Sequence, residues 1–354
     1  MFKLLFLSTP VGFLGSGIGG GVELSLYNVA KILLSRGHQI QVVAPASSVL
    51  PEIPIIEIAG NLQISAQSQE RDTPICLPPN SVLENMWDYA RQVQTEYDLI
   101  VNFAYDWLPF YLTPFFHRPI AHFITMASLS TAMDQIIQKI YAQFPQTLGF
   151  YSKVQAETFG IGDKGRYLSS AIDLSLYEFC NTPESHLAWC GRIAPEKALE
   201  DAVAACDQTG VPLKIFGKIQ DPQYWQKICQ DYPNAPIEYV GFLSTDELQR
   251  HLRKSRALIM TPRWVEAFGN VVIEALACGV PVIAYRRGGP AEIIEQGKTG
   301  FLVEPDDVMA LVSAIERLDE IDRLSCRISA ETHYSLDALG DRFEAWFKDI
   351  IAIA

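Results

Sequence analysis

The segment of residues 266–285 reads EAFGNVVIEALACGVPVIAY, and it indicates the fold class of the chain. Gly269 opens a predicted helix over residues 269–278 that is rich in small side chains. A short apolar run over residues 281–285 follows as a predicted buried strand. A helix packed on a buried strand is the unit from which α/β domains with parallel sheets are built.

The same alternation of short apolar runs and amphipathic helical stretches extends through both halves of the chain. In the first half the predicted strands are 3–7, 40–43, 99–103, 120–125 and 148–151, and the predicted helices are 22–35, 81–96 and 131–144. In the second half the predicted strands are 187–190, 213–216, 237–240, 257–260, 281–285 and 301–303, and the predicted helices are 196–208, 223–231, 246–254 and 269–278. Residues 60–80 are predicted to form a long loop.

These elements predict two doubly wound, Rossmann-like domains with a polar, proline-containing linker between them at residues 173–185. The first domain covers residues 1–173, and the second covers residues 174–335. An amphipathic C-terminal helix, residues 336–354, is expected to pack back on the first domain. Ligands of such domains bind beyond the carboxyl ends of the strands, so we expect a site in a cleft between the two sheets.

Composition excludes several classes of protein. The chain of 354 residues has a net charge of −13 and no cluster of basic residues, which argues against a nucleic-acid or anionic-membrane surface. The seven scattered cysteines contain no CxxC pair, so reduced thiols in a cytoplasmic protein are expected, without a metal site. The apolar stretch at 101–116 is interrupted by Asp106, Pro109 and Pro114, and is too short to span a bilayer.

A glycine-rich stretch over residues 15–20 matches GxGxxG, the dinucleotide-binding pattern. Two features argue against a dehydrogenase: a loop separates the stretch from the first strand, and Ala44-Pro45 stands where an acidic residue is needed. Residues 19–23, GGGVE, instead suit a helix start that approaches an anion through backbone N–H groups. A surface loop in which Glu23 compensates the helix dipole is the equal alternative.

The second half carries more specific motifs. The segment WCGRIAPEK over residues 189–197 places Arg192 and Lys197 just beyond a predicted strand, where two cations can hold a diphosphate and stabilise it as it leaves. Glu266 lies in the loop before the helix that Gly269 opens, and Glu274 lies on that helix. Carboxylates at these places can accept hydrogen bonds from sugar hydroxyls. The alternatives are ordinary surface cations and a helix with one dipole-favoured and one buried glutamate.

Taken in order, the glycine-rich loop, GR-x4-K, E-x7-E, CGVPVIA, GG-x2-E at 288–292 and GKTG at 297–300 resemble retaining glycosyltransferases of family 4. The resemblance implies a GT-B fold, a nucleotide-sugar donor such as UDP-glucose, and catalysis without a metal or other cofactor. It makes Glu266, Arg192 and Lys197 catalytic. The residues that it places around the donor are Gly20, Gly21, Arg192, Lys197, Glu266, Phe268, Gly269, Asn270 and Glu274.

The chain departs from that family's pattern at three positions. Met126 stands where many relatives have a histidine near the donor sugar, which leaves that sugar contact open. Ala267 and Ala198 each stand where relatives often have glycine.

A finer resemblance is to UDP-glucose-dependent glucosyltransferases that act on tetrahydrobiopterin, and it rests on residues 8–12, 102–111 and 263–266. It implies a reduced pterin as acceptor and a pteridine glycoside as product. The residues expected at the acceptor are Tyr105, Asp106, Trp107 and Met126. Aromatic side chains there could stack on a flat ring; the alternative is that they form an ordinary aromatic core.

Other activities stay open at this point. An isomerase or epimerase of nucleotide sugars would use the same donor residues, and so would a transferase with a lipid or polysaccharide acceptor. A binding protein without catalysis would keep Glu274 and could lose Glu266. We expect small-molecule partners only, and the sequence does not indicate an oligomeric state.

Overall fold

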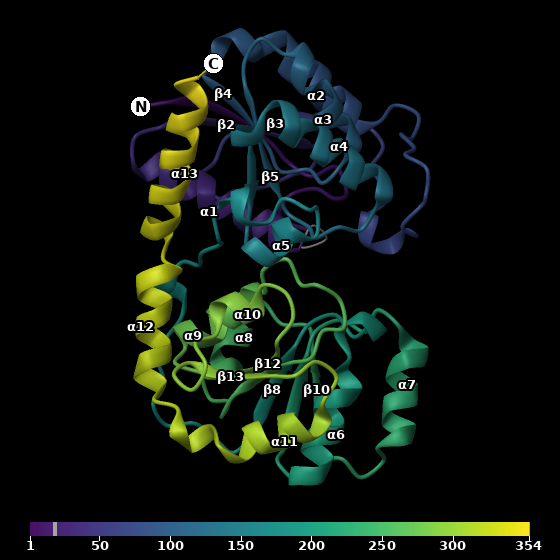
Figure 1. The fold of residues 1–354 in the computed structure, drawn as a ribbon, viewed down its shortest axis with the longest axis vertical. Helices are drawn as coiled ribbons and strands as arrows, with labels where there is room; N and C mark the ends of the chain where they lie inside the picture. Colours follow the sequence, from purple (N-terminus) through teal and green to yellow (C-terminus); the bar gives the residue numbers. More distant parts are fainter. Residues whose placement is uncertain (17–19, 354) are drawn as a thin grey trace. The chain divides into compact units, whose positions relative to one another are not determined.

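In the computed structural model, which describes residues 1–16 and 20–353, the chain divides into two compact units. Met1–Ala171 and Leu336–Ala354 form the first unit, and Ile172–Ser335 form the second. Each unit is a parallel sheet covered by helices (Figure 1). The doubly wound α/β architecture predicted from the alternation of strands and helices is therefore present in both units.

The sheet of the first unit has seven parallel strands in the order β3-β2-β1-β4-β5-β6-β7. The four central strands carry almost continuous runs of buried residues, as expected for a sheet that is covered on both faces. Its strands are β1 (Lys3–Leu7), β2 (Gln39–Pro45), β3 (Ile55–Ile58), β4 (Leu99–Asn102), β5 (Ile120–Ile124), β6 (Leu148–Phe150) and β7 (Arg166–Tyr167). Its helices are α1 (Gly21–Ser35), α2 (Val82–Val93), α3 (Trp107–Leu112), α4 (Thr131–Gln143), α5 (Lys153–Glu157) and α13 (Leu336–Ile351).

The C-terminal helix α13 lies beside α1 (Figure 1). Arg36, at the end of α1, forms ion pairs with Asp341 at 2.8 Å and Glu344 at 3.1 Å. On the apolar face of α13, the buried ring of Phe343 packs edge-on against Phe123 of β5, and the two ring centroids are 5.2 Å apart. The helix thus covers one face of the first sheet, although the whole second unit separates it from that sheet in the sequence.

The sheet of the second unit has six parallel strands in the order β10-β9-β8-β11-β12-β13. Its strands are β8 (Leu187–Cys190), β9 (Leu213–Phe216), β10 (Ile237–Gly241), β11 (Leu258–Met260), β12 (Val282–Tyr285) and β13 (Gly300–Val303). Its helices are α6 (Leu199–Thr209), α7 (Pro222–Asp231), α8 (Thr245–Leu252), α9 (Asn270–Ala277), α10 (Pro290–Ile293), α11 (Val308–Glu316) and α12 (Arg323–His333).

In both sheets the order in which successive strands are added reverses once, and this reversal positions the candidate sites. The chain builds outward from β1 to β3 and then returns to place β4 on the other side of β1. In the second sheet β11 returns to the other side of β8 in the same way. At such a switch point the loops after the two strands diverge and leave room for a ligand. Ligand sites are therefore expected at the loops after β8 and β11, and at the loops after β1 and β4.

Among the described residues, no helix is long and apolar enough to cross a lipid bilayer.

Candidate active site

The loop after β8 presents both predicted cations of the second unit. Lys197 ends a short 3-10 turn, Pro195–Lys197, and Ala198 then takes a left-handed conformation with φ of 45° before α6 begins. A Cβ atom is disfavoured in that conformation, which glycine adopts most readily. The Arg192 guanidinium donates to Gln220 and forms an ion pair with Glu196 at 2.9 Å.

The loop after β11 carries Glu266, and the structure brings it to Lys197. The Lys197 ammonium forms a direct ion pair with Glu266 Oε2, and the same oxygen accepts a hydrogen bond from Trp264 Nε1 at 2.9 Å. Burial alone would raise the pKa of this carboxyl, but the charge and hydrogen bond of Lys197 and the Trp264 N–H outweigh burial. The pKa of Glu266 is therefore below its ordinary value. The side chain is an ionised carboxylate that is fixed by Lys197 and Trp264.

Two glycines fix the backbone of Glu266. The Gly289 N–H donates to the Glu266 carbonyl at 2.7 Å. Gly288 has φ of +70°, and a Cβ atom there would lie 2.5 Å from the Glu266 carbonyl oxygen and 2.6 Å from its nitrogen. The GG-x2-E motif thus acts structurally, because only glycine lets the two backbones approach this closely.

Helix α9 begins directly after this loop. Gly269, with φ of +99°, precedes its first residue, Asn270, and Phe268 is buried beside it. The Asn270 Oδ1 atom is buried and has no hydrogen-bond partner in the structure. The first turn of a helix leaves backbone N–H groups without intrahelical partners, which favours an anion there.

Glu274, one turn further along α9, has the opposite environment to Glu266. Burial raises the pKa of its carboxyl to about 7. Among the described residues no side chain or backbone N–H donates a hydrogen bond to it, while the thiol of Cys190 at the end of β8 is close enough to feel its charge. A partly exposed carboxyl without donors is a vacant hydrogen-bond acceptor. The two predicted glutamates thus differ sharply, one already paired and one unpaired.

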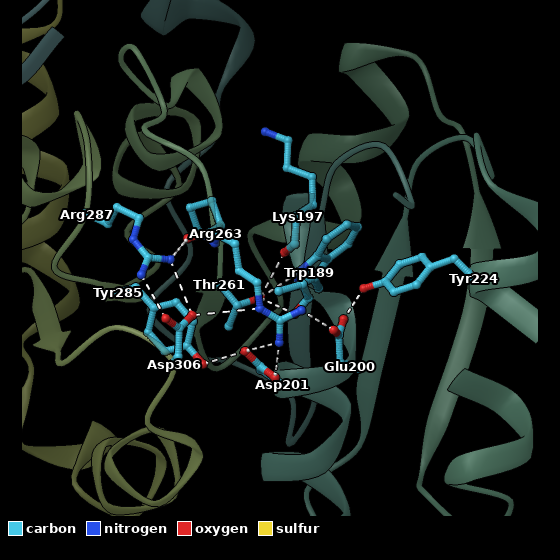
Figure 2. Close-up of polar contacts among 12 residues, drawn as sticks. Trp189, Lys197, Glu200, Asp201, Tyr224, Thr261, Arg263, Tyr285, Arg287 and Asp306 are labelled. Atoms are coloured by element: carbon cyan, nitrogen blue, oxygen red, sulfur yellow. Dashed lines mark hydrogen bonds and ion pairs between the residues drawn. The ribbon is translucent and has the colours of Figure 1, made fainter. Parts of the chain in front are cut away.

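A network of charged side chains surrounds Arg263, which lies in the same loop as Glu266 (Figure 2). Arg263 pairs with Asp201 of α6 at 3.0 Å, with Glu200, and at 3.8 Å with Asp306. Asp306 in turn pairs with Arg287 at 2.8 Å. The network ties the loop after β11 to α6 and to the loop after β13.

Two hydrogen bonds to backbone carbonyls also hold the loop. The Arg287 guanidinium, after β12, donates to the Pro262 carbonyl at 2.9 Å, and the Arg263 N–H donates at 2.9 Å to the carbonyl of Glu196, after β8. The sequence motifs do not predict this network or the role of Trp264, although Arg263 and Trp264 stand within the segment 263–266 on which the finer resemblance rests.

The first unit holds the residues predicted for the acceptor at the carboxyl ends of β4 and β5. Asp106 accepts from Gln63 Nε2 at 3.3 Å, and burial raises the pKa of its carboxyl to about 7. Met126, after β5, receives a weak contact from Gln67 Nε2 at 3.6 Å on its sulfur. The predicted long loop, which contains both glutamines, therefore crosses the edge of the sheet next to these two residues.

The predicted aromatic residues take part in packing. The Tyr105 hydroxyl accepts from the Leu129 N–H at 3.2 Å, and Tyr105 packs on the core between α3 and α4. Trp107 packs on the same core and stacks on Tyr111, with ring centroids 4.6 Å apart. Both rings thus contact apolar or aromatic side chains of the first unit in this structure.

The glycine-rich stretch lies only partly within the described residues, because Gly17, Ile18 and Gly19 lie outside them. Gly20, with φ of 57°, precedes α1, and Gly21 is its first residue. The Glu23 carboxylate accepts from the Gly15 N–H at 2.9 Å. Glu23 therefore ties the loop after β1 back to the first turn of α1.

Comparison with known proteins finds similarity in the second unit. Residues 181–332 match the family described as glycosyl transferases group 1, and they contain the motifs from Arg192 to Gly300 on which the family resemblance rests. A 131-residue stretch is 35% identical to the sulfoquinovosyl transferase SQD2 of Arabidopsis thaliana, and it covers 36% of this chain but only 25% of that protein.

Solved structures are similar over the whole chain. Anabaena HepE in complex with UDP has a TM-score of 0.78 at 19% identity, covering 98% of this chain and 100% of HepE. Sucrose-phosphate synthase from Thermosynechococcus elongatus has a TM-score of 0.78 at 18% identity, covering 100% of both chains. With the two parallel-sheet units, this likeness confirms the predicted GT-B fold class.

Proposed function

We propose that the protein is a retaining glycosyltransferase that moves a hexose from a nucleoside diphosphate sugar to a hydroxyl group of a small acceptor. The observation that carries the proposal is the meeting of Lys197 and Glu266 at the switch point of the second sheet. A diphosphate needs cations, whereas a sugar needs hydrogen-bond acceptors, and here one of each is held in direct contact. The match of the surrounding residues to glycosyl transferases group 1 supports this assignment.

The donor-binding roles follow from charge and placement. Arg192 and Lys197 bind the diphosphate and stabilise the negative charge that develops on it as the bond to the sugar breaks. The first turn of α9 supplies backbone N–H groups to the same phosphates, with Phe268, Gly269 and Asn270 at its start. Glu274 accepts hydrogen bonds from the ribose hydroxyls, and its lack of other donors supports this role.

Uridine and glucose are our proposal for the base and the sugar of the donor. Support comes from a structure of similar fold, Anabaena HepE, which was also solved in complex with UDP-glucose.

In the proposed reaction the bond between the sugar anomeric carbon and the phosphate oxygen breaks, and the electron pair leaves with the diphosphate. The acceptor hydroxyl bonds to the same face of the sugar, and its proton passes to an oxygen of the leaving phosphate. Glu266 binds a sugar hydroxyl, so no side chain forms a covalent bond. In the competing double displacement Glu266 attacks the anomeric carbon, and a trapped glycosyl ester on Glu266 would identify that route.

For the acceptor we propose four residues of the first unit: Tyr105, Asp106, Trp107 and Met126. A carboxyl with a pKa of about 7 and one long hydrogen bond can accept from a hydroxyl or N–H group of a ligand. A reduced pterin carries both kinds of group, and the finer sequence resemblance supports it as the acceptor.

Mass spectrometry of reaction mixtures tests this function. The protein is incubated with UDP- and GDP-sugars, each with and without a reduced pterin, beside a Glu266→Gln variant and an exposed control, Glu238→Gln. We expect a glycoside and free UDP from UDP-glucose with the wild type and the control, and a much slower reaction with Glu266→Gln. Conversion of the donor into another nucleotide sugar would identify an isomerase instead. No change in any donor would refute the proposal.

A further inference from the structure

Trp264 contacts every charged group of the loops after β8 and β11 that the proposed function uses. The Lys197 ammonium lies over its indole ring, 4.8 Å from the centroid, and the Arg192 guanidinium lies over it at 5.7 Å. Its Nε1–H donates to Glu266 Oε2 at 2.9 Å. One side chain thus contacts two cations through its ring and one carboxylate through its N–H.

We infer that Trp264 is a positioning residue that holds Arg192, Lys197 and Glu266 ready for the donor before it binds. The inference rests on the proposed function and goes beyond it, because none of the sequence motifs assigns Trp264 a role. Lysine and arginine side chains have many rotamers, and each loses that freedom when it binds a phosphate. An aromatic face that attracts both cations removes part of that freedom in advance.

The indole can act in this way because the residues that precede it in the chain are held by other elements of the second unit. Thr261, at the start of the same segment, donates to the Ala198 carbonyl at 2.7 Å. Next to Trp264, Arg263 is held by Asp201, Glu200 and Asp306 (Figure 2). The backbone that leads into Trp264 is therefore anchored to elements of the same unit.

The N–H of Trp264 has a separate consequence for Glu266. It is one of the groups that offset burial and hold the pKa of Glu266 below its ordinary value. The indole ring and the indole N–H therefore act on different partners. Phenylalanine keeps an aromatic face and removes the N–H, whereas leucine removes both, so two variants separate the two effects.

The experiment compares Trp264→Phe, Trp264→Leu and a control, Trp225→Phe on α7, in the full chain. UDP binding is measured by calorimetry, and release of UDP from UDP-glucose is measured between pH 3 and 9. We expect Trp264→Leu to bind UDP about 5- to 30-fold more weakly, from the loss of two cation–π contacts. Trp264→Phe should bind UDP within about twofold of the wild type, because phenylalanine keeps an aromatic face for the two cations.

The acidic limb of the pH–rate profile of Trp264→Phe should move to higher pH, because Glu266 then loses the hydrogen bond from the indole N–H. The Trp225→Phe control should match the wild type in both measurements.

Two results would overturn the inference: Trp264→Leu binding UDP as tightly as the wild type, or a Trp264→Phe profile that superimposes on that of the wild type. If Trp264→Leu does not fold, the pH profile of Trp264→Phe decides alone. Failure of the wild type to bind UDP would instead refute the proposed function. The two failures are therefore distinguishable.

Discussion

Replacing Glu274 by glutamine should stabilise the protein at neutral and alkaline pH while it weakens donor binding. The pKa of the Glu274 carboxyl is raised by burial from an ordinary 4.5 to about 7. A carboxyl whose pKa is raised on folding contributes stability below its unfolded pKa, and that contribution is lost as the pH rises through the folded value. In this chain the loss falls between about pH 4.5 and pH 7. Glutamine has no proton to lose and avoids this cost.

The size of the effect follows from the shift. Each pKa unit corresponds to about 1.4 kcal/mol, so the shift sets an upper bound of about 3 kcal/mol above pH 7. The side chain is partly exposed, and solvent screening reduces the bound to an expected gain of about 1–3 kcal/mol at pH 8. At pH 5 the gain should fall below about 1 kcal/mol, because Glu274 is then mostly protonated in the folded state.

Urea denaturation of the wild type, Glu274→Gln and the exposed control Glu238→Gln at pH 5 and pH 8 measures this difference. The control should show no gain that grows with pH. In steady-state kinetics Glu274→Gln should raise the donor KM with little change in kcat, because ribose contacts are the same in the ground and transition states. A gain in stability that is equal at both pH values, or a loss at pH 8, would refute the reasoning.

Three further predictions address the support of the site. Arg263→Met should cost about 1–3 kcal/mol of unfolding free energy in urea, because it removes the cation that pairs with buried Asp201; a cost near zero would mean that the network does not hold the loop. Gly288→Ala should lower both stability and turnover, since its Cβ atom would lie 2.5 Å from the Glu266 carbonyl oxygen. Gly297→Ala is the matched control, with φ of +72° and nothing within 4 Å, so equal losses in the two variants would show that backbone strain alone is responsible. Activity should persist in EDTA, because the diphosphate is bound by side-chain cations; loss on chelation that added metal restores would contradict this.

Most strands of the two sheets could be predicted from the sequence, because the central strands are buried on both faces. The apolar runs at β8 (Leu187–Cys190) and β9 (Leu213–Phe216) have the predicted limits. The strands that were missed, β3 and β7, lie at the edges of the first sheet, where side chains are partly exposed and the apolar run is short. Edge strands have a weaker sequence pattern because only part of their surface is covered.

Helix α3 was missed for a different reason. Pro109 interrupts the apolar run at 101–116, and it lies at the third position of α3 (Trp107–Leu112). Proline is tolerated in the first turn of a helix, because the N–H groups there have no intrahelical partner to lose.

The sequence motifs single out the residues of the candidate site, but they do not predict which of them contact one another. The motifs place Lys197 and Glu266 each beyond a strand, and they contact one another because β11 returns to lie beside β8. The order of strands depends on long-range packing, which short motifs do not record. The same limit hid Trp264, whose partners Arg192 and Lys197 lie about seventy residues earlier in the chain.

Calorimetric titration of the full chain with UDP and with uridine tests the central claim most directly, using the wild type, Lys197→Met and the exposed control Lys227→Met on α7. We predict that UDP binds to the wild type and the control, and that uridine binds far more weakly because it lacks the diphosphate. Lys197→Met should lose about 10- to 100-fold in UDP affinity, the equivalent of one charge-assisted hydrogen bond. Absence of UDP binding to the wild type, or equal affinity of Lys197→Met for UDP, would contradict a diphosphate site at Lys197.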